Sequence, residues 1–392
     1  MMRKTILGGI WLACACGRSA AAGYYLPNQD AFATAKGNAF VATADNPSAV
    51  FYNPAGLTQL DQPEFQAGFY SIILGNRAKI DGSTYGTDSE IQVAPQLFYG
   101  AAINDRLSYG FGLNSPFGLG TDWGQNTPFR SVVTEARLLY ASGTAALAYE
   151  LTDELSVGVS LSANYADLKL AQGIYGVPGS YFKFTGDGFA PAASIGLRWQ
   201  PLEKHAFGFN FTTQSDFTLR GRTDSNLLPD DSSSNMNFIT PARLAAGYSY
   251  RPAPGWNLEA NVEWIDWDSL NTLKLKTSSA GGDSVAVPFE WESSFIYELG
   301  VSYTTPSGYV IAAGYDYNES AQPDQNFNPG VSDADRHWFN AGFGHRGDCS
   351  DWMLAYQFGY SNRDVTGSSV PEANGRYEAR HHALVFSWNY RF

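Results

Sequence analysis

Cysteine and histidine are scarce in this 392-residue chain, which limits the disulfides and the catalytic or metal sites that it can form. Of the three cysteines, Cys14 and Cys16 lie in the first 22 residues, so removal of that segment leaves Cys349 alone and excludes an intrachain disulfide. The one histidine pair, His381-His382, would point to opposite faces of a strand. No Gly-x-Ser-x-Gly motif or metal-ligand spacing accompanies it, which argues against an enzyme and against a metal or other cofactor.

Charged residues and long apolar runs are also scarce. Charged residues make up 16% of the chain, and the formal net charge of −13 makes nucleic acid a poor candidate partner. No run reaches the roughly 18 apolar residues of a membrane-spanning helix. Aromatic residues, in contrast, make up 15% and glycine occurs 40 times. Few charges, many aromatics and no spanning helix favour a membrane β-barrel, in which only every second residue faces lipid.

The first residues, MMRKTILGGIWLACACGRSAAA, have the order of a secretory signal. Arg3 and Lys4 precede a short apolar stretch, and small residues follow it, so we predict a signal peptide over residues 1–21. Cleavage after Ala21 or after Ala22 fits equally well. Cys14 and Cys16 also suggest a lipoprotein, although their sequence contexts suit lipid attachment poorly.

From about residue 63 the hydrophobic period is two. In the C-terminal HHALVFSWNYRF, the larger apolar and aromatic side chains fall on one face, and these are Leu384, Phe386, Trp388, Tyr390 and Phe392. This alternation is typical of outer-membrane strands. A terminal Phe resembles the signal by which barrel-assembly machinery recognises its substrates, so we expect Phe392 to contact it. The alternative, the last strand of a soluble sandwich, would need a second sheet to cover this face.

Short and long connections alternate along the chain. Six tight turns lie at 104–106, 152–154, 201–204, 252–255, 307–308 and 347–351, and seven longer polar loops lie near 81–89, 117–136, 174–186, 224–236, 279–288, 318–334 and 364–376. These connections join fourteen strands, an even number with short turns on one side. The sequence therefore predicts an all-β membrane protein, a monomeric 14-stranded antiparallel transmembrane barrel over residues 63–392.

Residues 22–62 break this pattern. Their stretch DNPSAVFYNPAGLTQL holds two Asn-Pro pairs, which mark turns or helix starts rather than a strand. Fourteen strands enclose a lumen wider than side chains alone can fill. We therefore expect residues 22–62 to lie inside the barrel as a plug, or hatch.

Several segments together resemble the FadL/TodX family of outer-membrane transporters. Residues 23–60 are similar to the family's N-terminal hatch, with Asn53-Pro54-Ala55 as the most specific element. Further matches are LNSPFGLGTDW (113–123), YELTDELSVGVSL (149–161), NVEWIDWDSL (261–270) and DADRHWFNAGFGHR (333–346). The resemblance covers essentially the whole mature chain.

The resemblance implies an outer-membrane protein of a Gram-negative bacterium, in contact with membrane lipid and lipopolysaccharide. It implies uptake of hydrophobic compounds by passive diffusion through a plugged barrel, with lateral release into the membrane. Long-chain fatty acids are the first expected cargo, and monoaromatic hydrocarbons or alkanes are the alternative. A structural or adhesive barrel is the alternative of another class, but such a barrel needs neither a wall kink nor a structured plug.

The resemblance also places two groups of site residues. The N-terminal peptide, here with Tyr24, Tyr25 and Leu26, reaches toward the internal ligand site, unless it is a disordered terminus. Ser115-Pro116-Phe117-Gly118 corresponds to the kink that opens a gap in the barrel wall. A proline removes a hydrogen bond from the ladder, so the strand must bend there, or else Pro116 ends the strand at the outer rim.

Three arginines are candidates for holding an acidic cargo. Arg243 alternates with Ala242 and Leu244, which directs it into the lumen near mid-strand. It either binds a carboxylate or pairs with Glu259 or Glu263 on the next strand. Arg220 and Arg222 lie near the outer end of their strand and are rim candidates for first capture. The sequence leaves the cargo itself undetermined.

Overall fold

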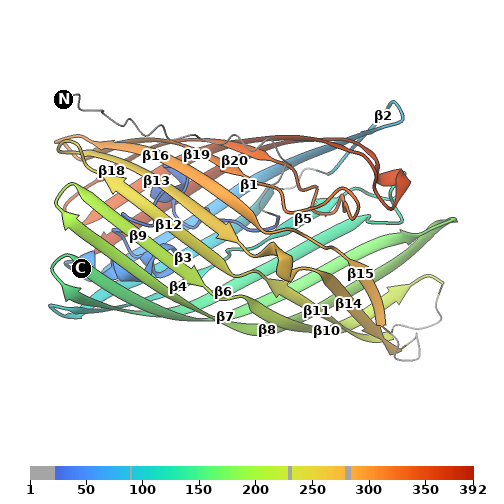
Figure 1. The fold of residues 1–392 in the computed structure, drawn as a ribbon, viewed down its shortest axis with the longest axis horizontal. Helices are drawn as coiled ribbons and strands as arrows, with labels where there is room; N and C mark the ends of the chain where they lie inside the picture. Colours follow the sequence, from blue (N-terminus) through green and yellow to red (C-terminus); the bar gives the residue numbers. More distant parts are fainter. Residues whose placement is uncertain (1–22, 89–90, 228–231, 279–283) are drawn as a thin grey trace, which may run out of the picture.

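The computed structural model describes residues 23–88, 91–227, 232–278 and 284–392, which form one closed antiparallel sheet of tilted strands (Figure 1). The barrel closes because β1 (Glu64–Ile80) pairs along almost its whole length with the last strand, β20 (Gly375–Arg391). The strands between them are β2 (Ser83–Gly86), β3 (Ile91–Asn104), β4 (Leu107–Asn114), β5 (Leu119–Asp122), β6 (Glu135–Thr152), β7 (Leu155–Ile174), β8 (Val177–Leu202), β9 (His205–Thr212), β10 (Ser215–Ser225), β11 (Ser232–Thr240), β12 (Arg243–Tyr250), β13 (Trp256–Ile265), β14 (Thr272–Thr277), β15 (Ser284–Pro288), β16 (Ser294–Thr304), β17 (Tyr309–Asn318), β18 (Arg336–Arg346) and β19 (Ser350–Val365).

These segments form fourteen spans, as the turn count predicts. Strand β2 is a short hairpin partner of β1. Five spans are each built from two successive segments, namely β4 with β5, β9 with β10, β11 with β12, β13 with β14 and β15 with β16. Among the described residues, no helix is both long and apolar enough to cross a membrane.

The period of two places apolar side chains outside and polar ones inside. On β20, Leu384 and Trp388 are 42% and 38% exposed, whereas Ala383 and Val385, on either side of Leu384, are buried. On β13 and β16, Glu259, Glu263 and Glu298 are all buried on the inner side. The outer face therefore suits lipid and the inner face carries the polar groups, as expected for an outer-membrane barrel.

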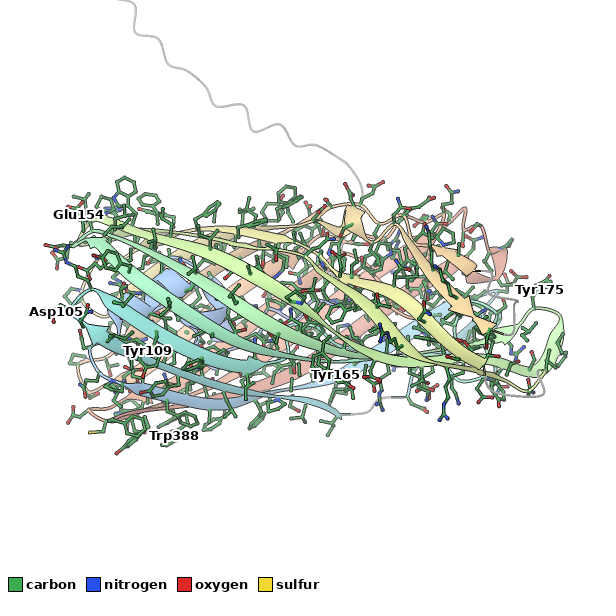
Figure 2. All side chains as sticks on the ribbon, turned by 90° about the horizontal axis from the view of Figure 1, so that it is seen from below. Asp105, Tyr109, Glu154, Tyr165, Tyr175 and Trp388 are labelled. Carbon is green, nitrogen blue, oxygen red and sulfur yellow. The ribbon has the colours of Figure 1, made fainter. Side chains whose placement is uncertain are left out.

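Tight turns gather at one end of the barrel. Asp105 and Glu154, from two of these turns, lie at one end, and Tyr175 lies at the other (Figure 2). The prediction of a long polar loop near 174–186 is wrong, because β7 runs to Ile174 and β8 begins at Val177. Gly176 has φ 71°, the left-handed conformation that a two-residue hairpin favours, so the two strands continue as a ladder where a loop was predicted.

The N-terminal segment, described from residue 23, packs against the inner side of the wall. It contains α1 (Ala31–Ala35), α2 (Ala49–Tyr52) and the 3-10 helix η1 (Pro54–Gln59). Helix α1 contacts β17 to β20, whereas η1 contacts β3, β4, β6, β7 and β8 on another part of the wall. Asp30 caps α1 by accepting a 2.7 Å hydrogen bond from the Ala33 N–H. Two further 3-10 turns, η2 (Trp267–Ser269) and η4 (Pro371–Ala373), follow β13 and β19.

The predicted signal peptide lies outside the described residues, which begin at Gly23. The same holds for Cys14 and Cys16 and for both cleavage sites. The domain limits 1–21, 22–62 and 63–392 stay predictions. Cys349 is a free, exposed cysteine.

Candidate functional site

The third span is interrupted at Pro116. Strand β4 pairs with β6 as far as Asn114 opposite Ser142, and β5 resumes the ladder with Leu119 opposite Leu138. Between them the N-terminal peptide supplies the missing bonds. The Leu26 N–H donates to the Pro116 carbonyl (2.9 Å) and the Gly118 N–H donates to the Tyr24 carbonyl (3.0 Å). Proline has no N–H to offer, so the span bends here and is held from the inside.

The same interruption opens a gap on the other side of the span. Strand β3 pairs with β4 only from Leu97 opposite Leu113 onward. Beyond that pair, no ladder joins β3 to β5 in the part of the chain that the structure describes. The two sides meet again where the Asp88 N–H donates to the Asp122 carbonyl (3.1 Å). We call this gap between β3 and β5 the wall opening.

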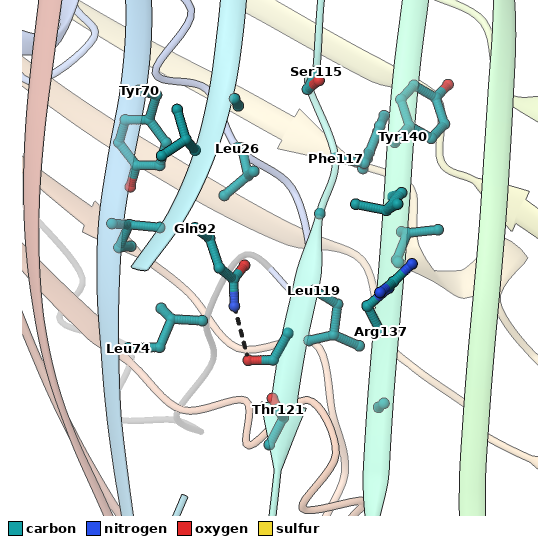
Figure 3. A pocket seen from close by; sticks show the side chains of 18 of the residues that line it. Leu26, Tyr70, Leu74, Gln92, Ser115, Phe117, Leu119, Thr121, Arg137 and Tyr140 are labelled. Atoms are coloured by element: carbon teal, nitrogen blue, oxygen red, sulfur yellow. Dashed lines mark hydrogen bonds between the residues drawn. The ribbon is translucent and has the colours of Figure 1, made fainter. Parts of the chain in front are cut away.

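One side chain bridges the wall opening. The Gln92 amide donates a 3.1 Å hydrogen bond from Nε2 to the carbonyl oxygen of Gly120 (Figure 3). A Cβ placed on Gly120 would collide with the end of the Gln92 side chain, so a larger residue at position 120 would displace the Gln92 amide. Neither Gln92 nor Gly120 was among the predicted site residues. The sequence signals near them are Pro116 and the glycines at 118 and 120, which ease a bend of the strand.

A cavity of about 330 Å³ occupies the wall opening. Its lining includes Tyr70 and Tyr140, which face inward and are buried, and Val93 and Leu139, which face outward and are 62% and 53% exposed. A cavity lined from both faces passes through the wall. Pro116 therefore lies within the wall, and the strand does not end at it, because β5 continues the span.

A second cavity of about 340 Å³, here called the apolar cavity, adjoins the first. The two share the lining residues Leu119, Ala136 and Leu138. The rest of its lining is dominated by aliphatic and aromatic side chains. Among them are Leu168 of β7, Phe184 of β8, Phe238 of β11, Leu275 of β14 and Phe289, which follows β15. No charged side chain lines the apolar cavity within the described part of the chain. Such a site suits an apolar ligand.

The predicted residues Tyr24, Tyr25 and Leu26 lie at these cavities. Tyr24 lines the apolar cavity and donates its hydroxyl to the Ile239 carbonyl (2.8 Å), while Leu26 lines the wall opening. The Tyr25 hydroxyl donates to Glu263 (3.2 Å). Burial raises the pKa of both phenols well above the ordinary value, so both remain neutral hydroxyls at physiological pH. The peptide from Tyr24 to Leu26 thus lies at the boundary between the two cavities.

Arg243 is buried and paired. Its guanidinium lies 2.9 Å from Glu263, also bonds the Tyr25 hydroxyl, and stacks 4.5 Å from the centre of the Tyr25 ring. Of the two glutamates predicted as alternative partners, Glu263 is the one in contact. The cation is thus already neutralised, and it lies outside the lining of the apolar cavity.

Glu259 instead binds the N-terminal segment. It lies 3.0 Å from Lys36 Nζ, with both side chains fully buried, and it accepts a 2.8 Å hydrogen bond from the Ala42 N–H. This ion pair was not predicted from the sequence. A signal was available, since Lys36 is the only basic residue between positions 22 and 62.

The Asn53-Pro54-Ala55 motif joins the N-terminal segment to the wall. Asn53 Nδ2 donates to the Val41 carbonyl (2.9 Å) and to the Leu197 carbonyl of β8 (3.0 Å). Its Oδ1 accepts from the Ala55 N–H (3.2 Å) and so caps η1, with Pro54 in the first turn. A Cβ on Gly196 of β8 would collide with the Asn53 side chain. The motif therefore fits against a glycine of the wall.

Arg220 and Arg222 do not line either cavity. Both lie on the outward side of β10 and are exposed. Their position on the outer surface of the wall does not bring them to the ligand route described above.

A closed barrel of fourteen spans with an apolar cavity leading to an opening in its wall defines an outer-membrane transport barrel. The sequence profile of the outer membrane protein transport protein family (OMPP1/FadL/TodX) matches residues 12–392, and the chain belongs to this family. The resemblance noted from the sequence is thus confirmed. The protein is an outer-membrane transport protein for hydrophobic compounds rather than an enzyme.

Individual relatives are distant but cover nearly the full length. The chain is 23% identical over 398 residues to a long-chain fatty acid transport protein of Salmonella typhi, covering 90% of this chain and 89% of that one. A crystal structure of a Pseudomonas aeruginosa FadL homologue superimposes with a TM-score of 0.85 at 18% identity, covering 95% and 100%. The toluene transporter TodX of P. putida gives 0.76 at 18% identity, covering 93% and 98%. At such identities the structural likeness shows the shared fold.

Proposed function

We propose that this protein lets hydrophobic compounds diffuse passively from the apolar cavity through the wall opening into the bilayer. The observation that carries the proposal is the shared lining of the two cavities by Leu119, Ala136 and Leu138. An apolar compound gains about 0.8 kcal/mol per methylene group on leaving water, so release into lipid is downhill. No carrier is needed for this step.

The N-terminal segment acts as a hatch in this proposal. It is tied to β13 by the buried Lys36–Glu259 pair and to β8 by the Asn53 hydrogen bonds. Breaking a buried ion pair by freeing one partner is strongly unfavourable, about 3–5 kcal/mol. A path that required the hatch to leave the lumen would have to break these contacts. The lateral path leaves these contacts in place, and the Gln92 side chain is the group that bridges it.

The uncharged lining of the apolar cavity favours an uncharged cargo, such as an alkane or a monoaromatic hydrocarbon. This reverses the order of the two cargo classes expected from the sequence. A carboxylate placed there would lose its hydration without gaining a cation, which is costly. The toluene transporter among the structural relatives is consistent with a neutral cargo, although it shares the fold alone at 18% identity.

A long-chain fatty acid is the second candidate cargo. Arg243 lies beside Tyr25, near the peptide that borders both cavities, and it would bind a carboxylate if Glu263 were protonated or displaced. The long-chain fatty acid transport proteins among the sequence relatives, at 22–23% identity, support this candidate.

Closing the wall opening tests the lateral path. The Ser115→Thr/Pro116→Val double variant restores a regular strand pair. The matched control is Pro191→Val, because Pro191 lies in an unbroken ladder of β7 and β8. After folding is confirmed by heat-modifiable gel mobility, uptake of radiolabelled hexadecane is measured in cells lacking other such transporters. We expect uptake to fall to background in the double variant and to persist in the control.

Unchanged uptake by a folded and closed double variant would refute lateral release and would require transport past a displaced hatch.

Two further sequence predictions stay predictions. These are the contact of Phe392 with barrel-assembly machinery and the monomeric state.

A further inference from the structure

A row of polar and basic side chains crosses three adjacent strands on the outer surface of the barrel. Arg220 of β10 is in register with Asn235 of β11, and Asn235 is in register with Lys276 of β14. All three side chains are exposed on the outward side of the sheet. Adjacent strands lie about 4.8 Å apart, so the two cations flank the Asn235 amide from about 10 Å apart. Lys274 extends the basic surface one step along β14.

The row lies close to an outward-facing aromatic pair of the outer wall. Phe189 of β8 is 74% exposed, and its ring lies 4.9 Å from that of Tyr165 on β7. Asp187, two residues before Phe189, is in register with Arg220. Two residues along a strand correspond to about 7 Å. Aromatic belts mark the head-group level of a bilayer, so the row lies just on the extracellular side of the apolar band.

In the part of the chain that the structure describes, the cations of the row are not engaged in ion pairs with the acids nearby. Within the described residues, Arg220, Lys274 and Lys276 form no ion pair. Asp224 is instead paired with Lys183 (3.1 Å), and Asp216 accepts a hydrogen bond from Gln214 (2.7 Å). Asp187 of β8 is in register with Arg220 and Asp167 of β7 is in register with Asp187, so the row continues into two acids on that side, whereas the section from Arg220 to Lys276 carries none. This basic section occurs in a chain with a net charge of −13, so it does not reflect the average composition.

We propose that Arg220, Asn235 and Lys276 bind a phosphate group of an anionic glycolipid of the outer leaflet. Arginine offers two parallel N–H donors to a phosphate, lysine adds a point charge, and the Asn235 amide adds a neutral donor. The long Arg and Lys stems allow both charges to converge over Asn235. The bound lipid would cover the outer wall formed by β10, β11 and β14, on which no ligand route opens.

The test uses the purified full-length protein in detergent and native mass spectrometry. The probes are lipid A carrying two phosphates and the same lipid A with both phosphates removed. The test variant is Arg220→Gln/Lys276→Gln. The matched control is Arg106→Gln/Lys204→Gln, which removes two exposed charges from the turns at the opposite end of the barrel. Folding of each variant is checked by heat-modifiable mobility.

We expect the wild type and the control to retain bisphosphorylated lipid A. The test variant should bind it about 30-fold more weakly, because each interfacial cation raises the affinity by roughly a factor of five and the variant removes two. The dephosphorylated lipid should bind wild type and test variant equally weakly. Equal retention of bisphosphorylated lipid A by wild type and test variant would overturn the proposal. Retention independent of the phosphates would overturn it as well.

Discussion

The backbone N–H of Leu26 donates a 2.9 Å hydrogen bond to the carbonyl oxygen of Pro116. This bond joins the N-terminal peptide to the one place where the third span loses its ladder. Tyr24, two residues earlier, lines the apolar cavity, and Leu26 itself lines the wall opening. The peptide and the kink therefore form one structural unit, and changes in either are expected to alter the passage between the two cavities.

Removing the side chain that bridges the wall opening should speed transport. Gln92→Ala eliminates the hydrogen bond to the Gly120 carbonyl, which is worth about 0.5–1.5 kcal/mol net. We therefore expect initial uptake of labelled hexadecane to rise about 2- to 10-fold where passage through the opening limits the rate. The control is Gln96→Ala, whose amide binds the Asn28 carbonyl away from the gap. A slower rate in Gln92→Ala with an intact barrel would contradict a gating role.

The Arg243–Glu263 pair distinguishes the two cargo classes. Arg243→Met alone leaves a buried, unpaired carboxylate and should destabilise the protein by about 3–5 kcal/mol. Arg243→Met/Glu263→Gln should recover most of this loss. In that double variant, we expect hexadecane and palmitate to bind with affinities changed by the same factor. A selective loss of palmitate binding, measured by isothermal titration in detergent, would instead assign Arg243 to the carboxylate.

Asn53 should hold the hatch in place. Asn53→Ala removes the hydrogen bonds to Val41 and Leu197 and the cap of η1, at a cost of about 1–3 kcal/mol. Amide hydrogen exchange in residues 41–60 should become faster, while exchange in the wall strands stays unchanged. Asn104→Ala, in an exposed turn, is the control. Unaltered exchange in residues 41–60 would show that Asn53 does not anchor the segment.

Asp333 should make stability depend on pH between about 4 and 6. Burial raises the pKa of this loop carboxyl to about 6, against the opposing effect of Arg336. In that window the folded state holds a proton that the unfolded state, with a pKa near 4, has lost. Stability therefore falls as pH rises through the window, by up to about 1.4 kcal/mol per pH unit, and is level above it.

Asp333→Asn should flatten this part of the profile, and Asp348→Asn, in an exposed turn, should not. Urea unfolding in detergent at half-unit pH steps measures the effect. Asp333 also accepts hydrogen bonds from the Gly23 N–H (3.1 Å) and the Ala321 N–H (2.7 Å). A profile that keeps its slope in Asp333→Asn would place the titrating group elsewhere.

The local sequence was sufficient for the architecture of the barrel. The period of two assigns each side chain to lipid or lumen, and the turn chemistry separates successive spans, so strand number and the inward direction of Arg243, Glu259 and Glu263 follow without tertiary information. The hairpin at Tyr175-Gly176 was misjudged because polar residues past the membrane still continue a ladder.

Contacts between distant segments depended on the tertiary structure. The sequence directs both Glu259 and Glu263 into the lumen but does not say which one reaches Arg243. In the barrel, Glu263 is opposite Ala245, close to Arg243, whereas Glu259 is opposite Ser249. Lys36, more than 200 positions away along the chain, forms the ion pair with Glu259. Strand register and the packing of the N-terminal segment together select the partners, because a buried charge is stable only beside the opposite charge that the closed barrel brings to it.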